Sequence, residues 1–185
     1  MGQISVERDS GGIAGLCVIT PTVHGDRRGY FTETYNLRDM QEAGIDTVFV
    51  QDNQSSSTKG VLRGLHYQIN YPQAKLVRVI RGKVFDVVVD IRKGSATFGK
   101  YYGIELSEEN HKQLFIPRGF AHGFIVLSDF AEFCYKCDDF YHPNDEGGII
   151  WNDPDINIAW PSVDVPLNFS DKDKVLPRLK EAVLP

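Results

Sequence analysis

Several features are scarce or missing in this sequence of 185 residues, and each absence excludes a class of protein. No apolar run reaches the roughly 20 residues that a membrane-spanning helix requires. Basic residues are not in surplus, because the formal net charge is −5 and acidic and basic residues are interspersed. We therefore expect neither a membrane protein nor a general nucleic-acid binder, which usually presents a basic face.

Cysteine is also rare, with Cys17, Cys134 and Cys137 only. The first residues, MGQISVERDSGG, lack the apolar core of a signal peptide, so we expect a cytoplasmic protein with reduced thiols. Cys134 and Cys137 form a C-x-x-C pair, but no second pair or matched histidines accompany it, which makes it a weak zinc signal. The surrounding residues, AEFCYKCDDFY, are typical of a strand rather than of the helix start of a redox motif.

The second half of the chain is dominated by short apolar runs that turn-rich segments separate. The runs from Leu76 onward read LVRVI, KVFDVVVDI, YYGIEL, KQLFIP, GFIVL, AEFCYKC and GGIIW. Many short strands at even spacing predict a β-sandwich or a closed barrel. No βαβ alternation occurs, so a parallel sheet is not expected. The length fits a single domain over residues 1–185, with an irregular tail over about 161–185 and one helical turn near Arg178 to Ala182.

The first half is more mixed. Leu16 to Pro21 is predicted as a strand, and Tyr30 to Tyr35, YFTETY, alternates as a half-buried strand does. Leu37 to Gly44 is the clearest helix, and it ends in a glycine. The run VFVQDNQSSS starts apolar and then turns polar.

The stretch GVLRGLHYQ, residues 60–68, carries the strongest chemical signal. His66 sits alone in a strand-like run, and imidazole exchanges protons at neutral pH, so we interpret it as a candidate base. The alternative is a buried structural histidine. Arg63 lies three residues earlier, hence on the opposite face of a regular strand, unless a bulge at Gly64 brings the two together. Lys75 is either an oxyanion-stabilising cation or a solvated lysine.

Other residues extend this site, each with an ordinary alternative. His122 lies in the turn-like IPRGFAHGF, but no H-x-H pair occurs anywhere, so a metal site is not expected. Tyr135 is either a packing residue or a general acid. Asp171 and Asp173 are candidates to orient an imidazole, or belong to a charged tail.

The motifs taken together resemble one family. These are GDRRGYFTETYN, FVQDNQSSS, GVLRGLHYQ, KLVRVIRGKVFDVVVDIR, FIPRGFAHGF, AEFCYKC, YHPNDEGGIIWNDPDINIAWP and SDKD, which span about Leu16 to about Leu176. The chain is similar to the dTDP-4-dehydrorhamnose 3,5-epimerases. The resemblance implies a cupin-type β-jelly-roll with a few short helices, a homodimer, no metal and no organic cofactor. It also implies a dTDP-linked 4-keto-6-deoxy sugar as substrate.

The same resemblance implies a role for each site residue. His66 would be the base, and Asp173 would orient its imidazole. Lys75 would stabilise the enolate, and Tyr135 would donate the proton from the other face. Tyr141 would stack on the thymine base. Further substrate contacts are implied for Arg28, Glu33, Gln51, Asp52, Asn53, Arg63, His122, Glu146 and Lys172, with Arg28 and Arg63 suited to the diphosphate.

Departures from the family pattern are small. The family motif often has phenylalanine at Tyr67, glutamate at Arg118 and an apolar residue at Cys134. Three alternatives remain open: an epimerase that inverts a single centre of another deoxysugar nucleotide, a non-catalytic sugar-nucleotide-binding cupin, and a metal-dependent cupin enzyme.

Overall fold

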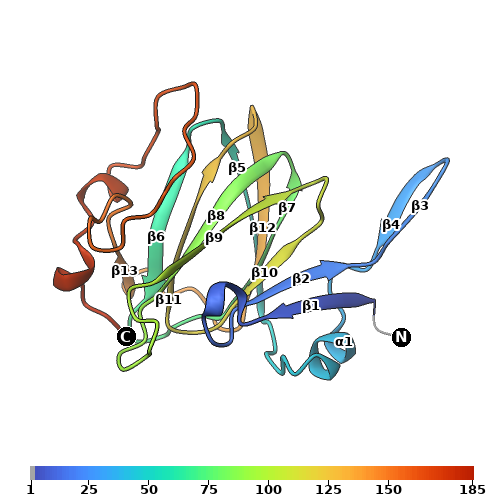
Figure 1. Cartoon of the computed structure of the whole chain (residues 1–185), viewed down its shortest axis with the longest axis horizontal. Helices are drawn as coiled ribbons and strands as arrows, with labels where there is room; N and C mark the ends of the chain where they lie inside the picture. The colour runs from blue at the N-terminus through green and yellow to red at the C-terminus, as the bar shows by residue number, and fades with distance from the viewer. Residues whose placement is uncertain (1–2) are drawn as a thin grey trace.

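Two antiparallel sheets face each other in the computed structural model, which describes residues 3–185 (Figure 1). The six-stranded sheet has the order β1 (Ile4–Arg8), β2 (Cys17–Pro21), β10 (Gln113–Ile116), β7 (Lys75–Arg81), β12 (Phe130–Cys137), β5 (Gln51–Thr58). The five-stranded sheet has the order β13 (Glu146–Gly148), β6 (Leu62–Gln68), β11 (Phe120–Val126), β8 (Lys83–Asp90), β9 (Tyr101–Ser107). The predicted all-β sandwich is therefore confirmed.

Helices are few and short. The α-helix α1 (Leu37–Glu42) begins after Asn36, whose side chain accepts the N–H of Arg38. It ends just before Gly44, which has a φ of +69°. Three 3₁₀ turns complete the set: η1 (Ser10–Gly12), η2 (Asp173–Val175) and η3 (Leu179–Glu181). Within residues 3–185 no helix is long and apolar enough to cross a membrane.

The apolar core has two main parts, one on each face of the five-stranded sheet. Val77, Val88 and Phe133 belong to the cluster between the two sheets. On the outer face, Val87 packs with Leu179 in a second cluster that the C-terminal residues help to cover. Alternate residues of β8 point to opposite faces, which explains why both faces of this strand are apolar. The C-terminal segment is irregular, as expected, but it packs against the sheet and is not a loose tail.

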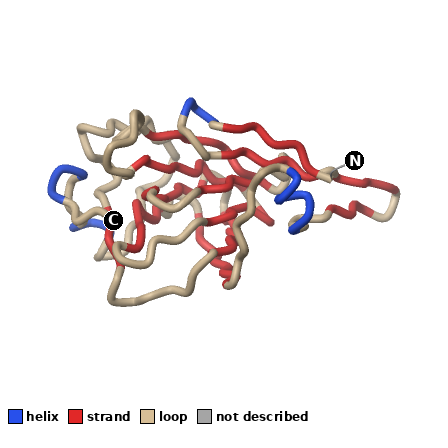
Figure 2. Tube along the Cα trace, turned by 90° about the horizontal axis from the view of Figure 1, so that it is seen from below, coloured by secondary structure: helices blue, strands red, loops and turns tan. Residues whose placement is uncertain are grey.

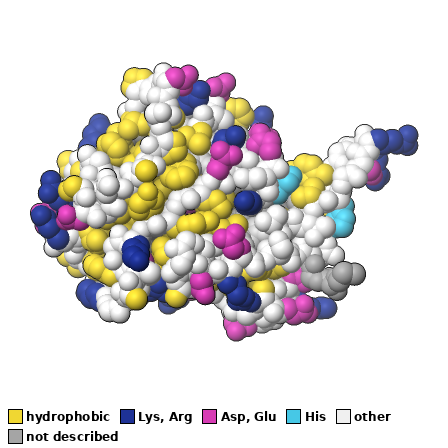
Figure 3. Space-filling view, in the orientation of Figure 1, with side chains coloured by type: hydrophobic (Ala, Val, Ile, Leu, Met, Phe, Trp, Pro, Cys, Tyr) yellow, Lys and Arg dark blue, Asp and Glu magenta, His cyan; other side chains and the backbone are white. Residues whose placement is uncertain are grey.

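The strands β3 (Val23–Asp26) and β4 (Gly29–Thr32) form a hairpin that projects from the rest of the molecule (Figures 1 and 2). We call this hairpin the arm. The half-buried strand predicted over YFTETY is only partly confirmed, because β4 ends at Thr32 and only Thr32 to Tyr35 are half-buried, whereas Tyr30 is 62% and Phe31 69% exposed. The physical reason for this exposure is that β3 and β4 pair only with each other, so no other strand lies beside them, although the ring of Tyr30 meets that of His111 at 5.0 Å between centroids. Basic side chains gather at the tip of the arm (Figure 3).

Two other expectations at the level of elements need correction. The strand expected at GGIIW is limited to Glu146–Gly148: Ile149 still exchanges both backbone hydrogen bonds with Leu65 of β6, but Ile150 donates to Pro177, outside the sheet. The strands β1, β3 and β5 had not been predicted, and all three consist largely of polar residues. β5 is QDNQSSST, a composition poor in the branched and aromatic residues that favour strands.

Candidate active site

A cavity of about 670 Å³ opens between the two sheets. The six-stranded sheet contributes Asn53, Lys75 and Tyr135 to its lining, and the five-stranded sheet contributes Arg63, His66 and His122. Glu146, Lys172 and Asp173 complete the polar lining from the later part of the chain. Nine of the predicted site residues, far apart in sequence, therefore share one cavity.

A bulge in β6 brings Arg63 and His66 to the same cavity. His66 pairs with His122 of β11, whereas Arg63 pairs with Phe124, so three residue steps on β6 match two on β11. Because of this extra residue, side chains three positions apart on β6 project from the same face of the strand. The bulge that the sequence offered as one of two possibilities is therefore confirmed. Gly64 lies in it with a φ of +115°, and a Cβ there would be 2.7 Å from both the Cα of Gly123 and the carbonyl oxygen of His122.

His66 and Asp173 form a hydrogen-bonded pair. The distance from Nε2 of His66 to Oδ1 of Asp173 is 2.6 Å, and the Asp173 side chain is almost fully buried. Burial opposes ionisation of this carboxyl, but the bonds from His66 and Ser170 outweigh it and lower the pKa of Asp173. An ionised carboxylate only accepts, so Nε2 carries the hydrogen and Nδ1 of His66 is left as a basic nitrogen. Of the two aspartates considered, Asp173 and not Asp171 meets the imidazole.

Lys75 and Tyr135 lie together on the wall opposite His66. The ammonium nitrogen of Lys75 is 5.7 Å from the centroid of the Tyr135 ring. Burial lowers the pKa of Lys75, and the nearby Cys137 and Asp86 act in the opposite direction. Burial also raises the pKa of Tyr135, so the phenol keeps its proton at neutral pH. The cavity thus holds a cation and a proton donor side by side.

His122 lies within strand β11 and not in the turn that the sequence predicted. A carboxylate that sequence reasoning missed holds its ring. Nε2 of His122 lies 2.9 and 3.1 Å from the two carboxylate oxygens of Asp86, which is fully buried in β8. A buried carboxylate requires such a partner. The available signal was an acidic residue, Asp86, with apolar residues on both sides of it in the run KVFDVVVDI, where an unpaired charge would be costly.

Three more lining residues have defined partners. Arg63 donates from Nε and Nη2 to the hydroxyl of Ser57, at 3.1 and 3.0 Å. Lys172 and Glu146 form an ion pair with each other. Glu146 and Lys172 therefore neutralise each other, whereas Arg63 is bonded to a neutral hydroxyl.

Three predicted residues, Tyr141, Gln51 and Asp52, lie beside the cavity rather than in its lining. The N–H of Tyr141 donates to Oε1 of Gln51 at 3.0 Å, and Gln51 in turn donates to Asn53 at 3.0 Å. Gln51 therefore links Tyr141 to a residue of the cavity wall. Asp52 points to the other face of the sheet, where its carboxylate pairs with Lys136 at 2.9 Å.

Two further predicted residues, Arg28 and Glu33, belong to the arm and the segment that follows it. Arg28 is exposed at the tip, where its guanidinium pairs with Asp26. Glu33 follows β4 and accepts a hydrogen bond from Asn36 at 2.7 Å. Neither residue lines the cavity of its own chain.

The part of the chain that the structure describes contains no group of three or more His, Cys, Asp or Glu side chains arranged to hold a metal ion. Cys134 and Cys137 are free thiols on β12, as their strand-like context predicted. Burial raises the pKa of the Cys137 thiol to about 11, so it is not a reactive thiolate at neutral pH.

Comparison with known proteins agrees with this geometry. The family model described as dTDP-4-dehydrorhamnose 3,5-epimerase matches residues 10–181. A relative of that name from Methanothermobacter thermautotrophicus is 54% identical over 168 residues, covering 90% of this chain and 91% of the relative. A crystal structure of dTDP-6-deoxy-D-glucose-3,5-epimerase from Legionella pneumophila in complex with dTDP-4-keto-L-rhamnose has a TM-score of 0.92 and 48% identity, covering 96% of this chain and 94% of that one.

A more distant structure is that of a 3′-monoepimerase from Streptomyces bikiniensis in complex with dTDP-quinovose. Its TM-score is 0.84 and its identity 34%, over 97% of this chain and 88% of that one. The expected cupin-type jelly roll is confirmed by these likenesses. With its fold, its cavity and its family match in agreement, this chain belongs to the dTDP-4-dehydrorhamnose 3,5-epimerase family of isomerases.

Proposed function

We propose that this chain epimerises dTDP-4-dehydro-6-deoxy-D-glucose at C3 and C5 to give dTDP-4-dehydro-L-rhamnose. The observation that carries the proposal is the placement of His66 and Tyr135 on opposite sheets that line one cavity. Inversion of a carbon requires that a proton leave one face and another arrive at the opposite face. A sugar ring held between the two sheets would meet these two requirements at once.

In the proposed mechanism, Nδ1 of His66 takes the proton from the carbon next to the ketone. The electron pair of that C–H bond moves into the carbon–carbon bond, and the carbonyl becomes an enolate. Lys75 stabilises the negative charge on the enolate oxygen. Tyr135 then gives its phenolic proton to the opposite face of the carbon, and solvent restores the proton of Tyr135 and removes that of His66. Asp173 holds the His66 ring in the tautomer that these proton transfers require.

The remaining predicted residues bind the substrate. Arg63 and Arg28 contact the diphosphate, since a guanidinium can hold phosphate oxygens by two bonds. Tyr141 stacks on the thymine ring. The other proposed contacts are Glu33, Gln51, Asp52, Asn53, His122, Glu146 and Lys172.

The proposed active form is a homodimer of single-domain chains in the cytoplasm. The exposed aromatics of the arm, Tyr30 and Phe31, support this because a free soluble surface seldom presents such a pair on a projecting hairpin. A dimer would also explain why Arg28 and Glu33 do not line the cavity of their own chain: they would reach the site of the partner. Neither nucleic acid nor a membrane is a proposed partner.

Solvent exchange tests the mechanism. In deuterium oxide, NMR of the wild-type reaction should show deuterium at both C3 and C5 of the sugar. His66→Ala should reduce turnover by roughly three orders of magnitude, as expected for the loss of a base. Tyr135→Phe should still incorporate deuterium through His66 but should invert the centres poorly. Lys112→Ala, on the surface outside the cavity, serves as control.

The same experiment separates the rival functions. Deuterium at only one carbon would favour a single-centre epimerase, which the likeness to the 3′-monoepimerase keeps in view. Tight dTDP-sugar binding without any exchange would indicate a non-catalytic binding protein. Near-normal turnover by His66→Ala would contradict the proposed mechanism.

A further inference from the structure

A short irregular segment, residues 139–142, connects β12 to β13 and is held through its backbone by glutamine side chains. Gln68 ends β6 and is buried. Its Nε2 donates to the carbonyl of His142 at 2.6 Å, and its Oε1 accepts the N–H of His142 at 3.1 Å. A side-chain amide that pairs with both backbone polar groups of one residue fixes that residue in position and in orientation.

Two other glutamines hold the same segment from different places. Gln51 of β5 accepts the N–H of Tyr141 at 3.0 Å. Gln73, just before β7, donates to the carbonyl of Asp139 at 2.8 Å. Every one of these bonds ends on the backbone of the segment, so its own side chains are left free to make other contacts.

The side chains that the segment presents are aromatic and open to solvent. Phe140 is 62% and Tyr141 49% exposed. The neighbouring His142 does not project in this way, because its ring stacks on Tyr71 with centroids 4.0 Å apart. An exposed ring on a fixed backbone suits the stacking of a planar ligand, since the loop loses little conformational freedom when the ligand binds.

Gln68 also fixes the position of this segment relative to His66, the proposed base, because both residues lie on β6. It lies two residues after His66 on β6, so both side chains project from the same face of the strand. Two residues of a strand span about 6.6 Å. The strand that carries the base therefore also carries the main attachment of the aromatic segment.

We infer that Gln68 and Gln73 are positioning residues for nucleotide binding, which fix the backbone beneath Tyr141 so that its ring is presented to the nucleobase at a set distance from His66. This inference rests on the proposed stacking role of Tyr141. Neither glutamine touches the reacting atoms. Their effect should therefore fall on the binding of the nucleotide and not on the chemical step.

Gln68→Met and Gln73→Met test the inference, because they keep the length of the side chain and remove the hydrogen bonds. We expect the Kd of dTDP, measured by calorimetry, to rise about tenfold in Gln68→Met and about threefold in Gln73→Met, in proportion to the bonds lost. The kcat for the dTDP-4-keto-6-deoxy sugar should stay within about twofold of wild type, with the change appearing in KM. Should Gln68→Met fail to fold, an unchanged Kd in Gln73→Met would still overturn the inference.

Asn110→Ala is the matched control. Asn110 also holds a loop through its backbone, accepting the N–H groups of Ser107 and Lys112, but it lies outside the cavity. Its replacement should lower stability without changing the Kd of dTDP. A fall in kcat with unchanged dTDP affinity in Gln68→Met would overturn the inference, because Gln68 would then act on His66.

Tyr141→Ala separates this inference from the function on which it rests. If dTDP binds Tyr141→Ala as tightly as wild type, the stacking role fails and the inference fails with it. If Tyr141→Ala weakens binding but Gln68→Met does not, only the inference fails. In the double variant, Gln68→Met should add little to the effect of Tyr141→Ala, since both act through one ring. Full additivity would show that Gln68 acts elsewhere.

Discussion

At Lys75 and Tyr135, burial shifts the two acidities in opposite directions. It lowers the pKa of the Lys75 ammonium from its usual value and raises that of the Tyr135 phenol. Both groups must be protonated in the proposed mechanism. The lowered pKa of Lys75 brings the loss of the stabilising cation to a lower pH than for an ordinary lysine, whereas the raised pKa of Tyr135 delays the loss of the phenolic proton.

We predict that the rate of solvent-deuterium exchange falls at alkaline pH because the ammonium group of Lys75 loses its proton. In Lys75→Arg the rate should be lower, but the alkaline limb should move to higher pH, because a guanidinium stays protonated throughout the accessible range. Lys83→Arg, outside the cavity, should leave the limb in place. A limb at the same pH in wild type and Lys75→Arg would assign the titration to another group.

The residues that meet in the cavity were the easiest part of the site to anticipate. His66, Lys75 and Tyr135 belong to residue types with few uses in a strand other than packing and chemistry, and family motifs surround them. Asp86 and Ser57 were missed because their importance depends on contacts across strands, Asp86 with His122 and Ser57 with Arg63. Ser57 lies in a polar run, and nothing in that run indicates that its hydroxyl accepts hydrogen bonds from Arg63.

At the scale of elements, the arm stands out because its aromatic side chains, Tyr30 and Phe31, are exposed in the single chain. The pattern YFTETY predicted a strand that the structure confirms for its first three residues, because alternation depends only on local sequence. It could not reveal that Tyr30 and Phe31 would be exposed in the single chain. Arg28 lies in the turn between β3 and β4 and does not line the cavity of its own chain, which it is nevertheless proposed to serve.

Mixing two inactive variants tests whether Arg28 acts on the partner's site. In a mixed dimer of Arg28→Ala and His66→Ala chains, one site would have an intact His66 and receive an intact Arg28 from the other chain. After unfolding and joint refolding, half of the dimers should be mixed with one working site each, so roughly a quarter of wild-type activity should return. Recovery requires that the active form be a dimer.

The control mixes His66→Ala with Lys75→Ala, two residues that line the cavity of the same chain. Each site in that mixed dimer lacks one group, so no activity should return. Failure of the Arg28→Ala mixture to exceed this control would place Arg28 and His66 in the same chain's site, or exclude a role for Arg28.

For the whole molecule, the strands of the second half followed from their composition, because apolar runs bounded by turns leave few alternatives to a sandwich. The order of strands within the sheets could not be predicted in this way. β5 pairs with β12 and lines the cavity although its sequence is almost entirely polar. Its polar residues face the cavity on one side and solvent on the other. A strand with two polar environments needs no alternation of apolar and polar residues, which is why β5 resembles a loop in sequence.

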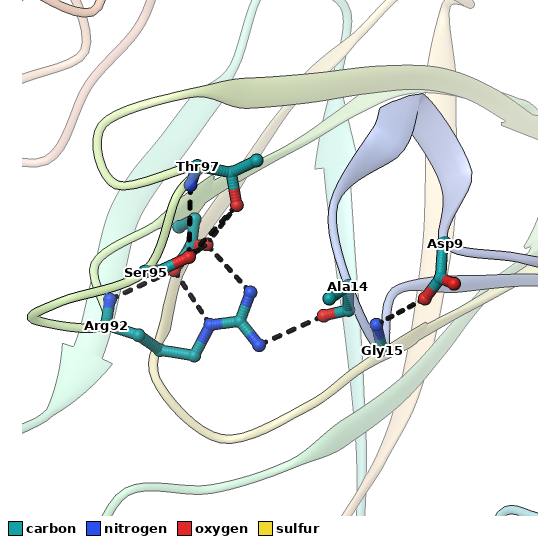
Figure 4. Close-up of polar contacts among 7 residues, drawn as sticks. Asp9, Ala14, Gly15, Arg92, Ser95 and Thr97 are labelled. Atoms are coloured by element: carbon teal, nitrogen blue, oxygen red, sulfur yellow. Dashed lines mark hydrogen bonds and ion pairs between the residues drawn. The ribbon is translucent and has the colours of Figure 1, made fainter.

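A buried polar cluster joins two distant parts of the sandwich (Figure 4). Asp90, at the end of β8, is fully buried and accepts hydrogen bonds from Arg92, Ser95 and Thr97 at 2.6 to 2.9 Å through their side chains. Arg92 extends the cluster to the carbonyl of Ala14 at 3.0 Å, in the loop before β2. Burial opposes ionisation of Asp90, but these bonds outweigh it and lower its pKa below the usual 3.8.

We predict that Asp90→Asn lowers the free energy of unfolding by about 2–3 kcal/mol at pH 7, since it removes the charge that several donors share. The melting temperature should fall by roughly 4–12 °C for a protein of this size.

The carboxyl of Asp90 is more acidic in the folded state, so its contribution to stability is complete above its ordinary pKa and is lost as the pH falls through the pKa of the folded state. The difference between wild type and variant should therefore shrink in strong acid. Asp164→Asn removes an exposed partner of Lys59 and should leave the melting temperature almost unchanged, because water screens such a pair. An equally small effect at Asp90 would show that the cluster does not stabilise the sandwich.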